Sequence, residues 1–282
     1  MTQRRGADDA HGTEMAEAAA TPAADGEEAD AEAVAFVRRH TRPGRAALVP
    51  ELQLYLAEAV VPLWEATERW AAGPQPPPFW AFAWPGSQVL ARWVLDQPAL
   101  VQHQRVLDLG AGSGLAALAA LRAGARAVVA NDLDPLAGTV QRLNAALNGL
   151  AVCRSPALRP PTGDAGSLTD DTGSATDDAG WLTGDADGLW IVCADLVGTM
   201  RAGLGVDVVL AGDVCYDRQQ APRITAWLRR LAAAGADVLL ADPGRTYAPL
   251  DGFEVLATFE VPTLPDLESA PSRTTRLLHL HG

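Results

Sequence analysis

The 282-residue sequence contains no lysine, and all 22 of its lysine-plus-arginine residues are arginine. We take this absence as a compositional bias, because arginine also fills ordinary surface roles. Cysteine is scarce: three residues without metal-ligand spacing favour unpaired, buried thiols in a reducing compartment. No apolar run reaches the roughly 18 residues of a membrane span, and the N-terminus lacks the apolar core of a secretory signal. The sequence therefore predicts a cytoplasmic protein without a membrane partner.

Acidic charge is concentrated in two segments. The formal net charge is −13, from 35 acids and 22 arginines. Residues 1–33 hold nine acids and two arginines, and residues 161–188 hold seven aspartates and no base. The rest has 19 acids against 20 arginines, a nearly neutral core that predicts no nucleic-acid partner. We expect residues 1–32 to be a disordered acidic tail, and 33–282 to be one domain with a low-complexity insert at about 155–188.

The pattern from residue 33 to residue 70 predicts a helical lead-in to this domain. Its second part carries the apolar residues Leu52, Leu54, Leu56, Val60, Leu63 and Trp64. From Arg105 onward, short apolar runs alternate with helical patterns, which predicts an α/β fold with a parallel sheet. Strands are expected at 105–109, 127–130, 189–193, 206–211, 236–241, 253–259 and 274–279.

The most informative segment is 106–114, where a buried strand leads into three glycines and a helix. The glycines are Gly110, Gly112 and Gly114. They let a ligand approach the backbone where side chains would collide. A dinucleotide-binding fingerprint, G-x-G-x-x-G, would need its third glycine at Leu115. Asp108 is placed to hold the ammonium of a methionine moiety, directly or through water. The segment favours S-adenosylmethionine, with a purely structural tight turn as the alternative.

Two further acids follow the next strands. Asp132 ends the second strand and can accept both hydroxyls of a ribose. It could instead cap the next helix, although Asp134, followed by Pro135, suits the N-cap better. Asp195, just past the third strand, is placed to accept the adenine amino group, with an ordinary loop aspartate as the alternative.

The segment 212–217, Gly-Asp-Val-Cys-Tyr-Asp, follows the fourth strand, at the sheet edge where ligands bind. Asp213 suits a cationic amine, because a carboxylate orients an ammonium and assists its deprotonation. Tyr216 would form a pocket wall that excludes water. The Asn/Asp-Pro-Pro-Tyr signature of enzymes that methylate amino groups of nucleic acids and glutamine is absent here. Alternatively, Asp213 caps the next helix and Tyr216 packs in the core.

Taken together, these motifs resemble the electron-transfer flavoprotein β-subunit lysine methyltransferases, within the seven-stranded protein lysine methyltransferases. The segments that carry the resemblance are 78–86, 107–114, 130–135, 212–217 and 241–245. It implies a class I, Rossmann-like α/β fold of seven strands, with helices on both faces. In that family the aromatic stretch Trp80–Trp84 lies over the entrance for cofactor and substrate, although clustered tryptophans are also common in cores. The acidic tail and the insert are foreign to the family.

The sequence therefore predicts an S-adenosyl-L-methionine-dependent protein-lysine N-methyltransferase that needs no metal. Asp213 and Tyr216 are the expected catalytic residues. The expected cofactor-binding residues are Asp108, Gly110, Gly112, Gly114, Asp132, Asp195 and Trp84. The resemblance implies an electron-transfer flavoprotein β subunit as partner. A small-molecule N-methyltransferase and a non-catalytic S-adenosylmethionine-binding module remain alternatives, and a nucleic-acid methyltransferase is less favoured.

Overall fold

The computed structural model describes residues 22–153, 187–199, 205–249, 251–263 and 270–280. The predicted insert at 155–188 falls almost entirely outside these residues, as do residues 1–21 of the predicted tail. Helix α1 (Pro22–His40) begins inside the segment expected to lack structure, and the division of the chain at residue 32 stays a prediction. Within the described ranges, no helix combines the length and apolar character needed to cross a membrane.

The lead-in contains a β-hairpin as well as helices. After α1, strand β1 (Arg42–Ala46) pairs antiparallel with β2 (Val49–Leu56), and α2 (Val60–Trp70) follows. The helix predicted around Leu52 and Leu54 is wrong, because both residues lie in strand β2, where their side chains are fully buried. Apolar positions 52, 56, 60 and 63 match helical spacing, but 52, 54 and 56 also alternate with the period of a strand.

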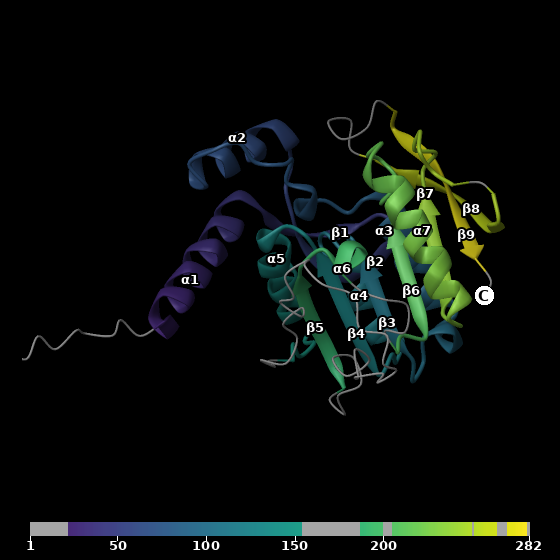
Figure 1. Cartoon of the computed structure of the whole chain (residues 1–282). Helices are drawn as coiled ribbons and strands as arrows, with labels where there is room; N and C mark the ends of the chain where they lie inside the picture. The colour runs from purple at the N-terminus through teal and green to yellow at the C-terminus, as the bar shows by residue number, and fades with distance from the viewer. Residues whose placement is uncertain (1–21, 154–186, 200–204, 250, 264–269, 281–282) are drawn as a thin grey trace, which may run out of the picture.

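A seven-stranded sheet forms the centre of the molecule, in the order β5-β4-β3-β6-β7-β9-β8 (Figure 1). Its strands are β3 (Arg105–Leu109), β4 (Ala127–Asp132), β5 (Gly188–Cys193), β6 (Val208–Gly212), β7 (Asp237–Asp242), β8 (Glu254–Pro262) and β9 (Ser272–Leu280). Strands β3 to β7 are parallel, whereas β9 is antiparallel to both β7 and β8. The prediction of parallel strands therefore fails for this last pair. The connection from β8 to β9 is shorter than the dozen or so residues of a parallel crossover.

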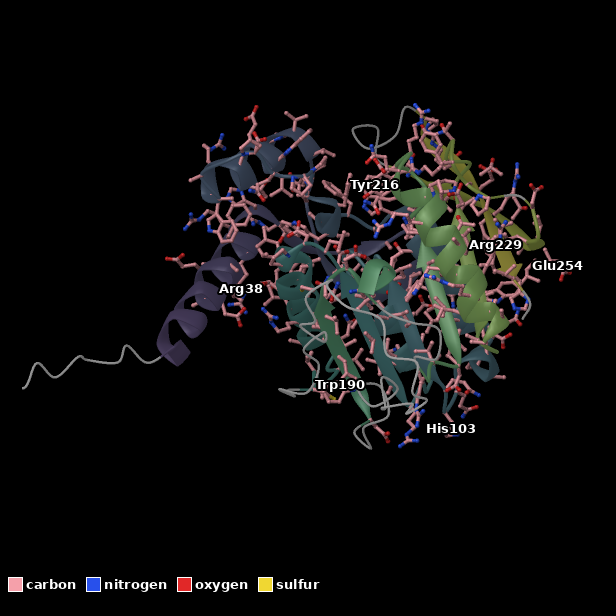
Figure 2. All side chains as sticks on the ribbon, in the orientation of Figure 1. Arg38, His103, Trp190, Tyr216, Arg229 and Glu254 are labelled. Atoms are coloured by element: carbon pink, nitrogen blue, oxygen red, sulfur yellow. The ribbon has the colours of Figure 1, made fainter. Side chains whose placement is uncertain are left out.

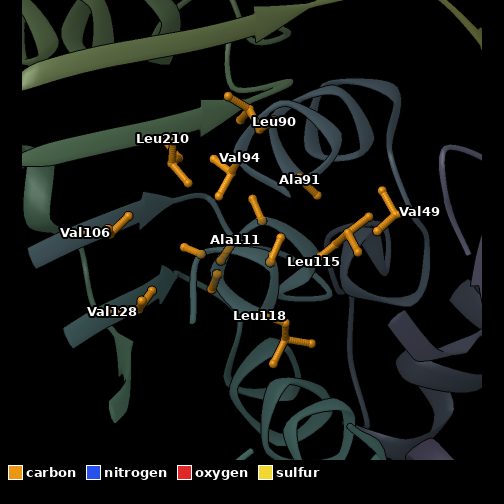
Figure 3. Close-up of a cluster of buried hydrophobic side chains, with 14 of the residues drawn as sticks. Val49, Leu90, Ala91, Val94, Val106, Ala111, Leu115, Leu118, Val128 and Leu210 are labelled. Carbon is orange, nitrogen blue, oxygen red and sulfur yellow. The ribbon is translucent and has the colours of Figure 1, made fainter. Parts of the chain in front are cut away.

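Helices cover both faces of the sheet, which confirms the predicted fold class. They are α3 (Pro85–Asp96), α4 (Leu115–Arg122), α5 (Pro135–Leu147), the short α6 (Leu196–Thr199) and α7 (Gln220–Ala233), with short 3-10 turns η1 (Phe79–Ala81) and η2 (Pro98–Leu100). Neighbouring strand residues belong to opposite cores. Val106 and Val128 pack with residues of α3 and α4 (Figure 3), while Leu107 and Val129 pack with Trp227 of α7. Burial on both faces explains why these strands are continuous apolar runs.

Helix α5 ties the lead-in hairpin to the glycine segment. The side-chain oxygen of Asn144 accepts a hydrogen bond from the backbone N–H of Tyr55 in β2 at 2.7 Å. The Asn144 side-chain nitrogen donates to the carbonyl of Ser113 at 2.8 Å. One turn earlier, Gln141 donates to the carbonyl of Gly112 at 3.1 Å. The loop between β3 and α4 is therefore fixed from the side of α5.

Candidate active site

A cavity of about 630 Å³ lies at the carboxyl edge of the parallel strands. Residues that follow β3, β4, β5 and β6 line it, as do residues of the segment before α3. Figure 2 shows Tyr216, which follows β6, at one end of the molecule and His103, which precedes β3, at the opposite end. The cavity thus occupies the edge at which open α/β sheets bind ligands, and its volume is typical of a small-molecule site.

The loop after β3 requires glycine for its backbone conformation. Gly110, Gly112 and Gly114 have φ angles of +65°, +50° and +80°. A Cβ atom added at Gly110 would lie 3.0 Å from a methyl carbon of Val214, tighter than ordinary contact. Gly110 and Gly112 line the cavity, whereas Gly114 is the N-cap of α4 and lies outside its wall. The loop therefore presents bare backbone to a ligand, as the sequence predicts.

Asp108 lies behind this loop. It is 2% exposed, and its Oδ2 accepts a hydrogen bond from the N–H of Ala117, in the first turn of α4, at 2.9 Å. Burial raises the pKa of Asp108 to about 7. Asp108 is not among the residues that line the described cavity, and its contact with the cofactor ammonium, direct or through water, stays a prediction. Asp108 supplies the N-terminal cap that Gly114 cannot give to α4.

Asp132 lines the cavity where β4 ends. One of its carboxylate oxygens accepts the N–H of Gly112 at 2.8 Å, and the other accepts the N–H of Asp134 at 3.0 Å. Asp134 is the N-cap of α5, as predicted, and accepts the N–H of Leu136 at 2.8 Å. Asp132 therefore joins the glycine loop to the start of α5, and its contact with a ribose stays a prediction.

Asp195 lines the same cavity after β5. Its Oδ2 lies 3.2 Å from a guanidinium nitrogen of Arg223, and the two side chains are 45% and 46% exposed. The structure thus brings Asp195 into one cavity with Asp132 and the glycine loop. The predicted contact with adenine is not tested by this arrangement.

Asp213 is a buried residue that lines the same cavity, with a φ angle of +57°. Its Oδ1 accepts hydrogen bonds from two nitrogens of Arg245 at 2.7 Å and 3.2 Å, and its Oδ2 accepts the N–H of Gly86. Burial raises the pKa of Asp213 to about 6, against the opposing effect of the Arg245 charge. The alternative that Asp213 caps the next helix is wrong: Asp217 does so, accepting the N–H groups of Gln219 and Gln220.

Aromatic side chains form a wall beside Asp213. The ring of Phe79 lies 5.6 Å from the ring of Trp84 and 5.3 Å from that of Tyr216, centre to centre. All three line the cavity, and Tyr216 is 56% exposed, so the alternative that it packs in the core is wrong. Trp80 and Phe82 are almost fully buried. The aromatic stretch thus contributes both to the cavity wall and to the core.

Two residues of the site were not expected as site residues. Arg245 pairs with Asp213, and Gly86 allows Asp213 to approach α3, because a Cβ there would lie 2.6 Å from Asp213 Oδ2. In the sequence, the segment 241–245 contributes only to the family resemblance. Its place after β7, the strand adjacent to β6, indicates the contact with Asp213, because an arginine there can reach the loop after β6.

The strand order, the glycine loop after β3 and the acid that ends β4 define a class I, S-adenosylmethionine-dependent methyltransferase. A family model described as ribosomal protein L11 methyltransferase matches residues 90–158. A relative in Xenopus laevis, named electron transfer flavoprotein beta subunit lysine methyltransferase, is 35% identical over 74% of this chain and 70% of its own length. A Danio rerio relative of the same name is 36% identical over 70% of this chain and 62% of its own length. The chain belongs to this lysine methyltransferase family.

The match leaves part of each relative uncovered, since the chain spans between 62% and 70% of their lengths. Among solved structures, magnesium protoporphyrin IX methyltransferase from Synechocystis PCC 6803 with bound S-adenosylmethionine is similar at a TM-score of 0.41 and 16% identity. That likeness covers 76% of this chain and 90% of the other. The family match confirms the family and the enzyme class, a methyltransferase, that the sequence predicts.

Proposed function

We propose that this chain transfers a methyl group from S-adenosylmethionine to the side-chain nitrogen of a lysine in a protein. The observation that carries the proposal is the buried carboxylate of Asp213 beside the aromatic rings of Tyr216 and Trp84, in the cavity that the glycine loop also lines. A carboxylate and aromatic faces attract a cationic amine, and the surrounding apolar wall removes its water.

The residues of the cavity fit the cofactor. Positive φ angles at Gly110 and Gly112 leave the loop without side chains, so the methionine part can lie against backbone. In this proposal Asp132 binds the ribose and Asp195 the adenine, and Trp84 contributes to the wall of the same cavity. Asp108 supports the loop from behind, by capping α4. Bound S-adenosylmethionine supplies a methyl group on a positively charged sulfur, which is already an activated leaving group.

The chain's own contribution is to align and desolvate the amine. The lysine ammonium first loses a proton to water, assisted by the carboxylate of Asp213. Bound S-adenosylmethionine, held by the glycine loop and Asp132, would supply the methyl group to this neutral nitrogen and would keep the electron pair of its carbon–sulfur bond, leaving as a neutral thioether. Asp213 orients the nitrogen, and Tyr216 excludes water from the reacting atoms. Positioning of this kind lowers barriers by roughly 7 to 11 kcal/mol when alignment is good.

The first protein substrate to test is an electron-transfer flavoprotein β subunit, which the names of the Xenopus laevis and Danio rerio relatives specify for those proteins. We place the reaction in the cytoplasm, since Cys153, Cys193 and Cys215 are unpaired thiols.

A labelled-methyl assay tests this function, and the enzyme itself contributes no lysine that could take up the label. The chain contains no lysine, so it cannot methylate a lysine of its own, and any methyl-lysine in the reaction belongs to a substrate. The purified chain is incubated with methyl-labelled donor and either the flavoprotein β subunit or whole lysate, while calorimetry measures donor binding.

We expect saturable donor binding and label on lysine in a protein. Label confined to small molecules would support the alternative small-molecule N-methyltransferase. Binding without transfer to any fraction would support a non-catalytic binding module. Label in the nucleic-acid fraction would also overturn the proposal.

A further inference from the structure

Arg245 connects three segments of the site. It ends the turn after β7, and Asp242 holds that turn by accepting the N–H groups of Gly244 and Arg245 at 2.7 Å each. The guanidinium lies 2.7 Å from Asp213 in the loop after β6, and 5.8 Å from the ring centre of Trp84, the N-cap residue of α3. The Arg245 side chain is 21% exposed, so these contacts are partly shielded from water.

The Asp213 carboxylate is held from two sides. Arg245 engages Oδ1, while the first turn of α3 engages Oδ2 through the N–H of Gly86. The backbone N–H of Asp213 also donates to the carbonyl of Ala241 in β7 at 3.0 Å. A φ angle of +57° is uncommon for aspartate and persists only where surrounding contacts determine it. Arg245 is therefore one of the groups that fix where Asp213 points.

Arg245 also sets the charge of this region. Burial raises the pKa of Asp213, the nearby Asp242 raises it further, and Arg245 lowers it. Burial also raises the pKa of Asp242, against the lowering effects of Arg245 and of Arg276 in β9. The neighbouring Cys215 thiol stays neutral, because burial raises its pKa to about 12. Without the positive charge of Arg245, the repulsion between the buried carboxylates of Asp213 and Asp242 would be less compensated.

We propose that Arg245 is a positioning residue for methyl transfer: it aims Asp213 at the target amine, keeps that carboxylate charged, and holds Trp84 against the same guanidinium. The proposal rests on the proposed function, because Arg245 can position Asp213 for catalysis only if the reaction has an amine that Asp213 orients. Arg245 acts through Asp213, so its removal should be felt in turnover far more than in donor affinity.

A double-mutant cycle separates this role from general stabilisation. Arg245→Gln is measured alone and in an Asp213→Asn background, with kcat, KM for the protein substrate and donor Kd determined for each variant. Arg92→Gln is the matched control, because Arg92 is 22% exposed and pairs with Glu51 and Asp96 at 2.7 Å each, away from the cavity. Arg245→Lys retains the charge with a different geometry.

For Arg245→Gln we expect a fall in kcat of about 30- to 100-fold with donor Kd within threefold, and less than a threefold effect in the Asp213→Asn background. Arg245→Lys should be intermediate, and Arg92→Gln should retain wild-type kcat. Wild-type turnover in Arg245→Gln would overturn the proposal. So would an equal loss in both backgrounds, or a loss in Arg92→Gln as large as that in Arg245→Gln.

A second readout does not depend on turnover. The carboxyl carbon of Asp213, followed by NMR in the donor-free protein, should titrate at a higher pH in Arg245→Gln than in wild type, because a positive neighbour has been removed. The acid limb of the kcat profile should move to higher pH with it. Unchanged titration in Arg245→Gln would overturn the proposal; if that variant does not fold, Arg245→Met, which also removes the charge, carries the measurement. Wild-type protein that transfers no methyl group to lysine would instead disprove the proposed function, while the titration still decides whether Arg245 controls Asp213.

Discussion

Two acids that line the cavity, Asp195 and Asp213, each pair with an arginine, and the two pairs differ chiefly in exposure. Asp195 and Arg223 are 3.2 Å apart with side chains 45% and 46% exposed, whereas Asp213 and Arg245 are 2.7 Å apart with side chains 8% and 21% exposed. Water screens the first pair, and exposed pairs contribute about 0 to 1 kcal/mol. The second pair interacts through a medium of lower polarity, where breaking a pair is strongly destabilising.

An acid–arginine pair therefore constrains the orientation and charge of its carboxylate differently at the two positions. At the exposed position, the acid can exchange its arginine for water or for a ligand group at little cost. At the buried position, the arginine and the helix N-terminus hold both carboxylate oxygens, so orientation and charge are fixed before a substrate arrives. Fixed groups of this kind are what alignment in catalysis requires.

The largest expected effect comes from removing the charge of the buried acid. Asp213→Asn keeps the size of the side chain but cannot assist deprotonation, and we expect kcat to fall about 1000-fold with donor Kd within threefold. Asp217→Asn in the same loop is the control, because Asn also caps helices well and Asp217 is exposed. Steady-state methyl transfer and calorimetry measure both. Turnover within tenfold of wild type in Asp213→Asn would remove the role we assign to this carboxylate.

The next effect tests the close approach that holds the buried pair. In Gly86→Ala, the new Cβ would lie 2.6 Å from both Asp213 Oδ2 and the carbonyl of Ala241. Because a backbone carbonyl cannot move aside easily, we expect the free energy of unfolding to fall by about 3 kcal/mol. Denaturant unfolding measures it. At Gly73 an added Cβ meets nothing within 4 Å, so Gly73→Ala should stay near wild type. Equal stability of the two variants would show that the approach is not tight.

Asp108 is a buried acid that belongs to neither of these two pairs. Among the described residues no basic side chain pairs with Asp108, and burial raises its pKa to about 7. The folded state therefore holds a proton that the unfolded state releases near pH 4, so stability should fall as pH rises, by about 2 kcal/mol between pH 5 and pH 7. In Asp108→Asn this part of the pH dependence should disappear.

The control for Asp108 is Asp207, an exposed acid that also accepts a backbone N–H, from Arg105 at 2.8 Å. Asp207→Asn should keep the wild-type dependence of unfolding on pH, measured by denaturant titrations between pH 5 and pH 8. If Asp108→Asn and Asp207→Asn gave the same pH dependence, Asp108 would be ionised in the folded protein.

What the sequence predicts well in this protein is local. The glycine loop at 110–114 and the N-cap at Asp134 are patterns of only a few residues; the structure confirms the cap, and the three glycines have positive φ angles that other residues rarely adopt. The alternating apolar runs likewise predict the core strands, because period and burial are set by neighbouring residues. The lead-in strand around Leu52 was wrong because both periods fit its apolar residues.

What sequence reasoning could not find is the contact between distant segments. Asp213 meets Arg245 across 32 positions and Gly86 across 127, and neither spacing leaves a periodic signal. Only the order of the strands makes these meetings necessary, since the loops after β6 and β7 share one edge of the sheet with the start of α3. The antiparallel pairing of β9 is likewise set by tertiary contacts.

The smallest expected effect concerns the exposed pair of Asp195 and Arg223. Arg223→Gln removes the charge that Asp195 faces, but the two side chains are nearly half exposed and water can replace the lost contact. We expect the free energy of unfolding to change by less than about 1 kcal/mol, and the change to shrink further as salt rises from 50 to 500 mM. Arg245→Gln, measured in parallel, should lose more stability and depend less on salt, because its pair is shielded. A loss in Arg223→Gln that equalled the loss in Arg245→Gln and persisted at high salt would mean that exposure does not distinguish the two pairs.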